Sequence, residues 1–261
     1  MTGQLAQPTS IRPVLRVTFD SNAWEKIFAP NDELYTPVRA ALADGRIQGF
    51  ICEAGFRIEA ITKRQRPDYF AQPFMGVNTE IRAMGGGKFE LMTSIGPDDS
   101  KHPGIPESQA PKFRLALAAG VKVMASLAWI GLPRPPELAD RTVFVPEAEA
   151  EARERQDRQI HAAFQIEGRG VGKGAFEAVN GWELVPRTPA EKKQLAKACA
   201  EWADGELVAA HIGYQNEVLC TDDHARTAGV SVFNADNRAW LTADFGVVFK
   251  TLNELMLMAN S

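Results

Sequence analysis

Four acidic residues that lie far apart in the chain have the right type and placement to bind one cation together: Asp20, Glu59, Asp204 and Asp223. Like charges that lie close together repel, so such a cluster costs free energy unless a cation is present. Carboxylate oxygens are hard ligands that suit Mg²⁺ or Mn²⁺. These ions activate water and neutralise charge on a phosphodiester. The chemistry predicted from these residues is therefore metal-dependent hydrolysis of phosphodiester bonds.

Two of the four acids come shortly after predicted strands. The short apolar run over residues 14–19 predicts a buried strand that ends at Asp20, and residues 218–220 predict another that is followed by Asp222 and Asp223. Ligands of open parallel sheets bind beyond the carboxyl ends of the strands. We therefore expect Asp20 and Asp223 to lie at the same edge of a sheet.

The other two acids are expected on helices near that edge. Glu59 lies on a predicted helix that follows a strand over residues 47–52, and Asp204 begins a predicted helical run through Ala210. Strands that alternate with helices predict an α/β fold with a mainly parallel sheet covered on both faces. A single Asp after a strand is more often a loop residue or a helix cap. The prediction of a metal site therefore depends on the whole set in this order.

The order and spacing of these residues resemble those of the PIN-domain nucleases. That family opens with an apolar strand, Asp, a small or polar residue and Asn or Thr, which matches Val17-Thr18-Phe19-Asp20-Ser21-Asn22. A helix bearing Glu follows, and Ile51-Cys52-Glu53 through Ile58-Glu59-Ala60 is similar to it. The third acid matches Asp204-Gly205-Glu206-Leu207-Val208-Ala209-Ala210, and the fourth matches Leu219-Cys220-Thr221-Asp222-Asp223.

The resemblance implies a three-layer α/β/α sandwich and metal-dependent cleavage, mostly of RNA. Many bacterial members of the family are toxins of toxin–antitoxin pairs and form homodimers, so an antitoxin-like protein partner is implied as well. By this resemblance Asp20, Asp204 and Asp223 would be the metal ligands, and Glu59 a ligand or general base. Residues that would hold the carboxylates or stand beside them are Asn22, Thr221 and Asp222.

The resemblance covers residues 14–65 and 189–258, which we predict to form the nuclease core. Residues 66–188 have no counterpart in the compact members of the family and are predicted to be an insertion or cap. Proline and glycine recur through this region, and residues 147–164 predict a charged amphipathic helix within it. Whether the region covers the site, selects substrate or forms a dimer interface is left open by the sequence.

Basic residues that could contact a phosphate backbone form two short groups. Both are weak signals, since a solvated helix end or a basic loop explains each of them equally well or better. The glycine-rich group lacks the spacing of a phosphate-binding loop, because Gly174 stands where Ser or Thr is required. The candidate residues are Lys63, Arg64, Arg66, Arg169 and Lys173.

The composition predicts a folded protein, and we expect no targeting signal. The chain has 261 residues, 45% of them hydrophobic, and a formal net charge of -4. Three dispersed cysteines favour neither a disulfide framework nor a zinc site and suit a reducing cytoplasm. No apolar run approaches the roughly 18 residues of a membrane span, so we expect a cytoplasmic protein with no membrane partner.

Two alternatives to a nuclease have different chemistry. A catalytically inactive PIN-like module would bind RNA or protein through residues 66–188. A phosphatase-like hydrolase would use Asp20 as nucleophile, but that class expects Asp-x-Asp after the first strand, and this chain has Asp20-Ser21-Asn22.

Overall fold

The computed structural model describes residues 14–30, 32–62, 64–70, 72, 75–127, 132–138, 143–184, 186–225 and 230–259. Within them, six strands form a central sheet in the order β6-β5-β2-β1-β7-β8, and every neighbouring pair is parallel. The predicted α/β class is therefore confirmed. The strands are β1 (Leu15–Phe19), β2 (Ile47–Cys52), β5 (Lys122–Met124), β6 (Val143–Phe144), β7 (Val218–Cys220) and β8 (Val248–Lys250).

Helices cover both faces of this sheet, and each face has its own apolar core. Side chains alternate along a strand, so neighbouring residues of β2 enter opposite cores: Phe50 packs in one and Ile51 in the other. One core is covered by α1 (Ser21–Ile27), α2 (Thr36–Ala43), α4 (Ala110–Ala118) and α9 (Leu252–Ala259). The other is covered by α3 (Arg66–Phe70), α5 (Glu149–Gly168), α6 (Lys173–Glu177), α7 (Pro189–Gly213) and α8 (Ala235–Phe245).

The long helix α7 is the main helix of the second core. It begins with a capping box, in which the Thr188 hydroxyl accepts the amide of Glu191 and the Glu191 carboxylate accepts the amide of Thr188. The prediction that a new helix begins at Asp204 is wrong, because α7 runs through that position without a break. Gly205 marks close packing instead: a Cβ there would lie 2.6 Å from the Cα of Gly172.

The predicted boundary of the core does not coincide with a boundary of the sheet. Residues 66–188 supply β5 and β6, and β5 pairs with β2 over Phe50–Cys52. They also supply α5, which packs along α7. No pattern in the sequence indicates these two strands, because β5 has three residues and β6 has two, too few for a periodic pattern.

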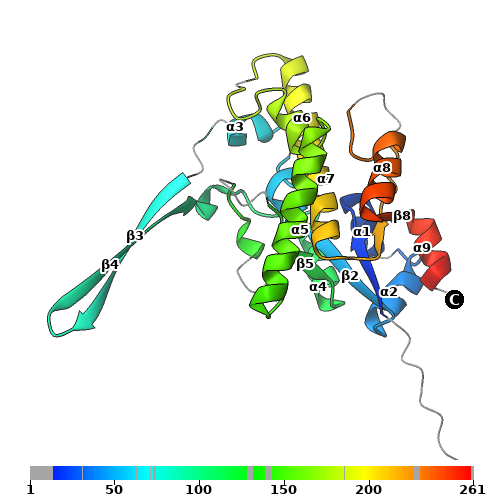
Figure 1. The fold of residues 1–261 in the computed structure, drawn as a ribbon, viewed down its shortest axis with the longest axis horizontal. Helices are drawn as coiled ribbons and strands as arrows, with labels where there is room; N and C mark the ends of the chain where they lie inside the picture. The colour runs from blue at the N-terminus through cyan, green and yellow to red at the C-terminus, as the bar shows by residue number, and fades with distance from the viewer. Residues whose placement is uncertain are drawn as a thin grey trace, which may run out of the picture.

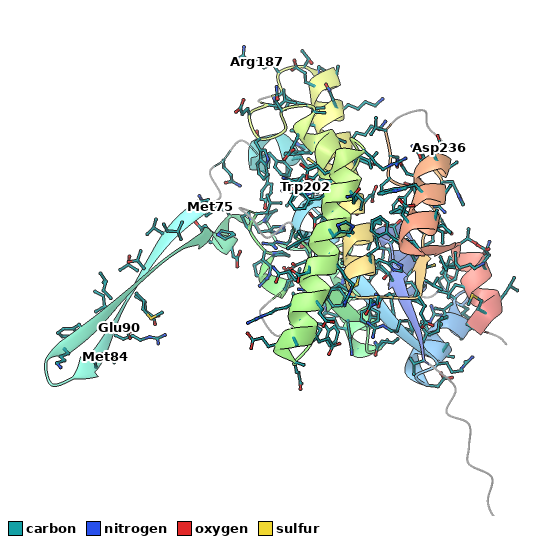
Figure 2. All side chains as sticks on the ribbon, in the orientation of Figure 1. Met75, Met84, Glu90, Arg187, Trp202 and Asp236 are labelled. Carbon is teal, nitrogen blue, oxygen red and sulfur yellow. The ribbon has the colours of Figure 1, made fainter. Side chains whose placement is uncertain are left out.

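One part of this region stands away from the body. Strands β3 (Met75–Gly85) and β4 (Lys88–Pro97) form an antiparallel hairpin that is separate from the central sheet. Figure 1 shows the hairpin as a long twisted arm, and Figure 2 shows its side chains, with Met75 near the base and Met84 near the tip. Short 3₁₀ turns follow at Asp99–Lys101 and Pro136–Leu138. In the described part of the chain, no helix has the length and apolar character needed to span a bilayer.

Candidate active site

Asp20 lies at the carboxyl end of β1 and is held there by several donors. Its carboxylate caps α1 by accepting the Ser21 amide at 2.6 Å. The other oxygen accepts the Asn22 side-chain amide at 2.5 Å and the Thr221 hydroxyl at 2.6 Å. Since Thr221 follows β7 and is fully buried, these bonds join the ends of two adjacent strands around one carboxylate.

Glu59, which follows the neighbouring strand β2, lies close to Asp20. It ends a π-helical turn, Gly55–Glu59, which follows β2 where an ordinary helix was predicted. Single π turns of this kind are frequent at functional sites because they redirect a side chain. The Ser21 hydroxyl donates to the Glu59 carboxylate at 2.7 Å, while the Ser21 amide donates to Asp20. Ser21 therefore connects the two carboxylates.

Asp204 completes the walls of one narrow cavity with these two acids. The cavity lies beyond the carboxyl ends of β1 and β2 and measures about 20 Å³. A volume of this size accommodates one water-sized occupant, since roughly 10–15 Å³ is the minimum. Three of the four predicted site residues thus share one small cavity: Asp20, Glu59 and Asp204.

The fourth acid, Asp223, lies in a wider groove next to this cavity. The groove measures about 480 Å³, and Asp204 lines both spaces. Asp223 is exposed, and its carboxylate accepts the Ala225 amide at 2.7 Å. Other polar residues on the wall of the groove are Lys197, Glu201, Asp222, His224 and Ser231.

Asp222, the neighbour of Asp223, has a structural role. Its carboxylate accepts the Lys26 ammonium at 2.7 Å and the Leu252 amide at 3.0 Å, so it anchors the start of α9. Its own amide donates to the Asn22 side chain. Asp222 therefore supports the loop that carries Asp223.

The acids of the cavity destabilise one another's charged forms. Burial, followed by the charge of Glu59, raises the pKa of Asp20 to about 7, although bonds from Thr221 and Ser21 oppose the change. Burial and the charges of Asp20 and Glu59 raise the pKa of Asp204 well above its ordinary value. Burial also raises the pKa of Glu59, with partial compensation from Ser21 and Arg66. The cavity therefore disfavours the ionised form of each of these three carboxyl groups.

As they stand, these carboxylates do not form a finished metal site. Among the described residues, no group of three or more His, Cys, Asp or Glu side chains is arranged to hold a metal ion. The acids share the walls of the cavity, and ion binding requires their side chains to rotate toward one another.

The basic residues predicted to contact phosphate are not gathered at the cavity. The prediction that Arg66 contacts phosphate is wrong. Arg66 is buried, and its guanidinium donates to the carbonyls of Glu59, Ile61 and Ala196. Lys173 pairs with Glu177 at 2.7 Å on α6. Of the remaining candidates, Arg169 bonds the side chain of Asn237, Arg64 is exposed, and Lys63 lies outside the described residues.

Arg66 instead positions the end of the π turn. We expect Arg66→Ala to lower the free energy of unfolding by about 3 kcal/mol, because it removes charged donors from two buried carbonyls and one partly buried carbonyl. The exposed neighbour Arg64→Ala should change it by less than about 0.5 kcal/mol. Urea denaturation of both variants measures this difference, and equal stabilities would contradict the role of Arg66.

Three residues of the site were missed from the sequence. The motif predicts Ser21 only as a small or polar residue, although it bonds both Asp20 and Glu59. Gln109 comes from the region predicted to be an insertion, yet it lines the narrow cavity. Glu201 lies one turn before Asp204 on α7, and this spacing of three residues on a helix was the available signal.

Similarity to other proteins does not identify the site. Comparisons of this chain with protein-family models, with curated proteins and with solved structures find no match.

Proposed function

We propose that this chain is a metal-dependent endoribonuclease of the PIN-domain kind, with a three-layer α/β/α core. The observation that carries the proposal is the meeting of Asp20, Glu59 and Asp204 on one water-sized cavity beyond the carboxyl ends of adjacent parallel strands. Carboxylates gathered from three distant segments raise one another's pKa values, a cost that a bound cation offsets.

A second feature of the cavity fits a cation. The side-chain oxygen of Gln109 is buried and has no hydrogen-bond partner among the described residues, while its amide nitrogen donates to Glu25 at 2.7 Å. Buried polar atoms without partners are rare in folded proteins. An amide oxygen beside three carboxylates makes a set of hard oxygen donors, which suits Mg²⁺ or Mn²⁺.

Each residue of the site has a separate proposed role. Asp20, Asp204 and, after rotation from its turn, Asp223 would hold the ion. Such an ion, when bound, lowers the pKa of coordinated water and offsets charge on the phosphodiester. Glu59 would accept the proton of the attacking water, a role that its raised pKa favours. Asn22 and Thr221 keep Asp20 oriented through their hydrogen bonds.

The wider groove would hold the substrate. It adjoins the cavity at Asp204 and has Lys197 and His224 on its wall. Lys197 is exposed on α7, where its ammonium can contact a phosphate while the scissile bond lies over the acids. This arrangement favours a single extended strand of RNA.

The proposal is tested by incubating the purified full chain with a mixed pool of labelled RNA and with Mn²⁺ or Mg²⁺. We expect internal cleavage that stops when EDTA is added and resumes when the metal is restored. Binding of RNA with no cleavage under any of these conditions would support the inactive PIN-like module instead. A role as a toxin predicts growth arrest on expression and relief by a protein encoded beside it.

Gln109 provides a separate test of the metal site. We expect Gln109→Ala to raise the Mn²⁺ concentration needed for half-maximal cleavage by about tenfold, as is typical when a supporting oxygen is lost. Lys112→Ala is the matched control, because Lys112 also bonds Glu25, at 2.9 Å, but does not line the cavity. Equal metal requirements in the two variants would exclude Gln109 from the site.

A further inference from the structure

The hairpin of β3 and β4 has two faces of different character. Residues directly opposite each other in an antiparallel pair lie on the same face, and residues two apart along a strand share it. One face consists of five cross-strand rows, all of them uncharged. These rows are Met75 with Pro97, Val77 with Ile95, Thr79 with Thr93, Ile81 with Leu91, and Ala83 with Phe89.

All the charged residues of the two strands lie on the other face. Arg82 is opposite Glu90, and Glu80 is opposite Met92 and pairs with Arg82 at 3.2 Å. Lys88 is opposite Gly85 beyond the irregularity near the tip. The hairpin therefore has one uncharged face, and the charged side chains of both strands all lie on the other.

The apolar face is open to solvent. Phe89 and Ile95 are each 72% exposed, and Val77 is 68% exposed. Figure 1 shows that the arm points away from the helices and the central sheet, so the body of the molecule does not cover this face. A two-stranded hairpin is marginally stable alone in water and needs a hydrophobic partner surface. A continuous apolar face of this kind marks an interaction site.

We propose that this apolar face binds the same face of a second copy of the chain. The face has no charged side chain with which to select an acidic or basic partner, so phosphate-bearing ligands are unsuitable. A second copy brings an identical uncharged face. Two such hairpins stacked about 10 Å apart would form a small four-stranded sandwich.

The order of the rows fits two-fold symmetry. The only row of hydroxyl-bearing residues, Thr79 with Thr93, is the third of five. A two-fold axis through this row sets threonines opposite threonines, where each hydroxyl can donate and accept. The same axis sets the Val77–Ile95 row over the partner's Ile81–Leu91 row, so apolar side chains meet apolar side chains. A C2 contact requires this self-complementarity.

The size of the face determines how tight the dimer can be. Strands of eleven and ten residues make a ribbon about 35 Å long and about 10 Å wide. The area covered per copy is well below the roughly 800 Å² of a standard interface. We therefore expect a reversible dimer that dissociates on dilution into the micromolar range. The surface belongs to residues 66–188, and the inference is independent of any nuclease activity.

Sedimentation velocity of the full chain from about 1 to about 100 μM tests the dimer, because this range spans affinities typical of small interfaces. We expect Leu91→Lys to raise the dissociation constant at least about 100-fold, since two unpaired ammonium groups would be buried per dimer. Met92→Lys is the matched control on the polar face, opposite Glu80, and should stay within about threefold of the wild type.

Crosslinking keeps the test valid if Leu91→Lys disturbs the hairpin. Thr79→Cys should be joined to its copy by a bismaleimide that spans about 10 Å, the separation of stacked sheets. Glu80→Cys, on the opposite face, should not, nor should the wild type, whose three described cysteines are buried. A chain that stays monomeric throughout, a dimer that Leu91→Lys leaves intact, or a monomer that binds lipid vesicles through the hairpin would overturn the proposal.

Discussion

Cleavage of RNA should fall at least about a thousandfold when Asp20 is replaced with asparagine, a loss of about 4 kcal/mol in transition-state stabilisation. Asparagine keeps the size of the side chain and one acceptor oxygen for the donors around it, so the fold should survive. It removes the negative charge that would hold the cation. Initial rates with saturating Mn²⁺ measure the effect, and circular dichroism checks the fold.

Two further variants sharpen this test. Glu59→Gln should lose cleavage to a similar extent while it retains metal binding, because Glu59 is proposed to accept a proton. Asp157→Asn is the matched control, since Asp157 is exposed on α5 and lines neither the cavity nor the groove. Unchanged cleavage in Asp20→Asn would remove the basis of the proposed function.

Asp204→Asn should stabilise the metal-free protein by roughly 1–3 kcal/mol at pH 8 and above, wherever Asp204 is ionised, because burial and the charges of Asp20 and Glu59 disfavour its charged form in the folded state. The sign of this change in stability follows from the pKa values of the carboxyl group in the folded and unfolded states. A carboxyl whose pKa is higher in the folded state than in the unfolded state binds protons preferentially when folded. Its favourable contribution is complete below its unfolded pKa and is lost as the pH rises through its folded pKa. For Asp20, this contribution is lost as the pH rises from about 4, the unfolded pKa, to about 7, the folded pKa.

The stability gain in Asp204→Asn should therefore shrink as the pH falls from 8 toward 4. Only the difference from the wild type is informative, because His102 and His211, with pKa values lowered to about 4 and about 3 by burial, destabilise the fold in acid. Thermal melts across this range in EDTA measure the difference. Addition of Mn²⁺ at pH 8 should raise the melting temperature of the wild type and have little effect on the variant. A variant less stable than the wild type at pH 8 would show that another group already neutralises Asp204.

The acids and the fold class could be predicted from the sequence because their signals are local. The apolar run of β1 ends at Asp20, and the run of β7 is followed within three residues by Asp223. Parallel strands bring such positions to one edge of a sheet whatever connects them. The same logic failed for residues 66–188, where two short strands join the sheet without a readable periodicity.

Taken alone, then, the sequence determined an α/β protein with acids beyond its strands. Only the tertiary structure decided that Asp204 and Glu59 share a cavity with Asp20, that Gln109 joins them, and that Asp223 lies in a neighbouring groove. It also decided that Arg66 is an internal support for Glu59. The physical reason is that the spacing of apolar residues and the preference for turns depend on residues that are neighbours in the sequence. The direction of a side chain, and the atoms that surround it, depend on packing between different segments of the chain.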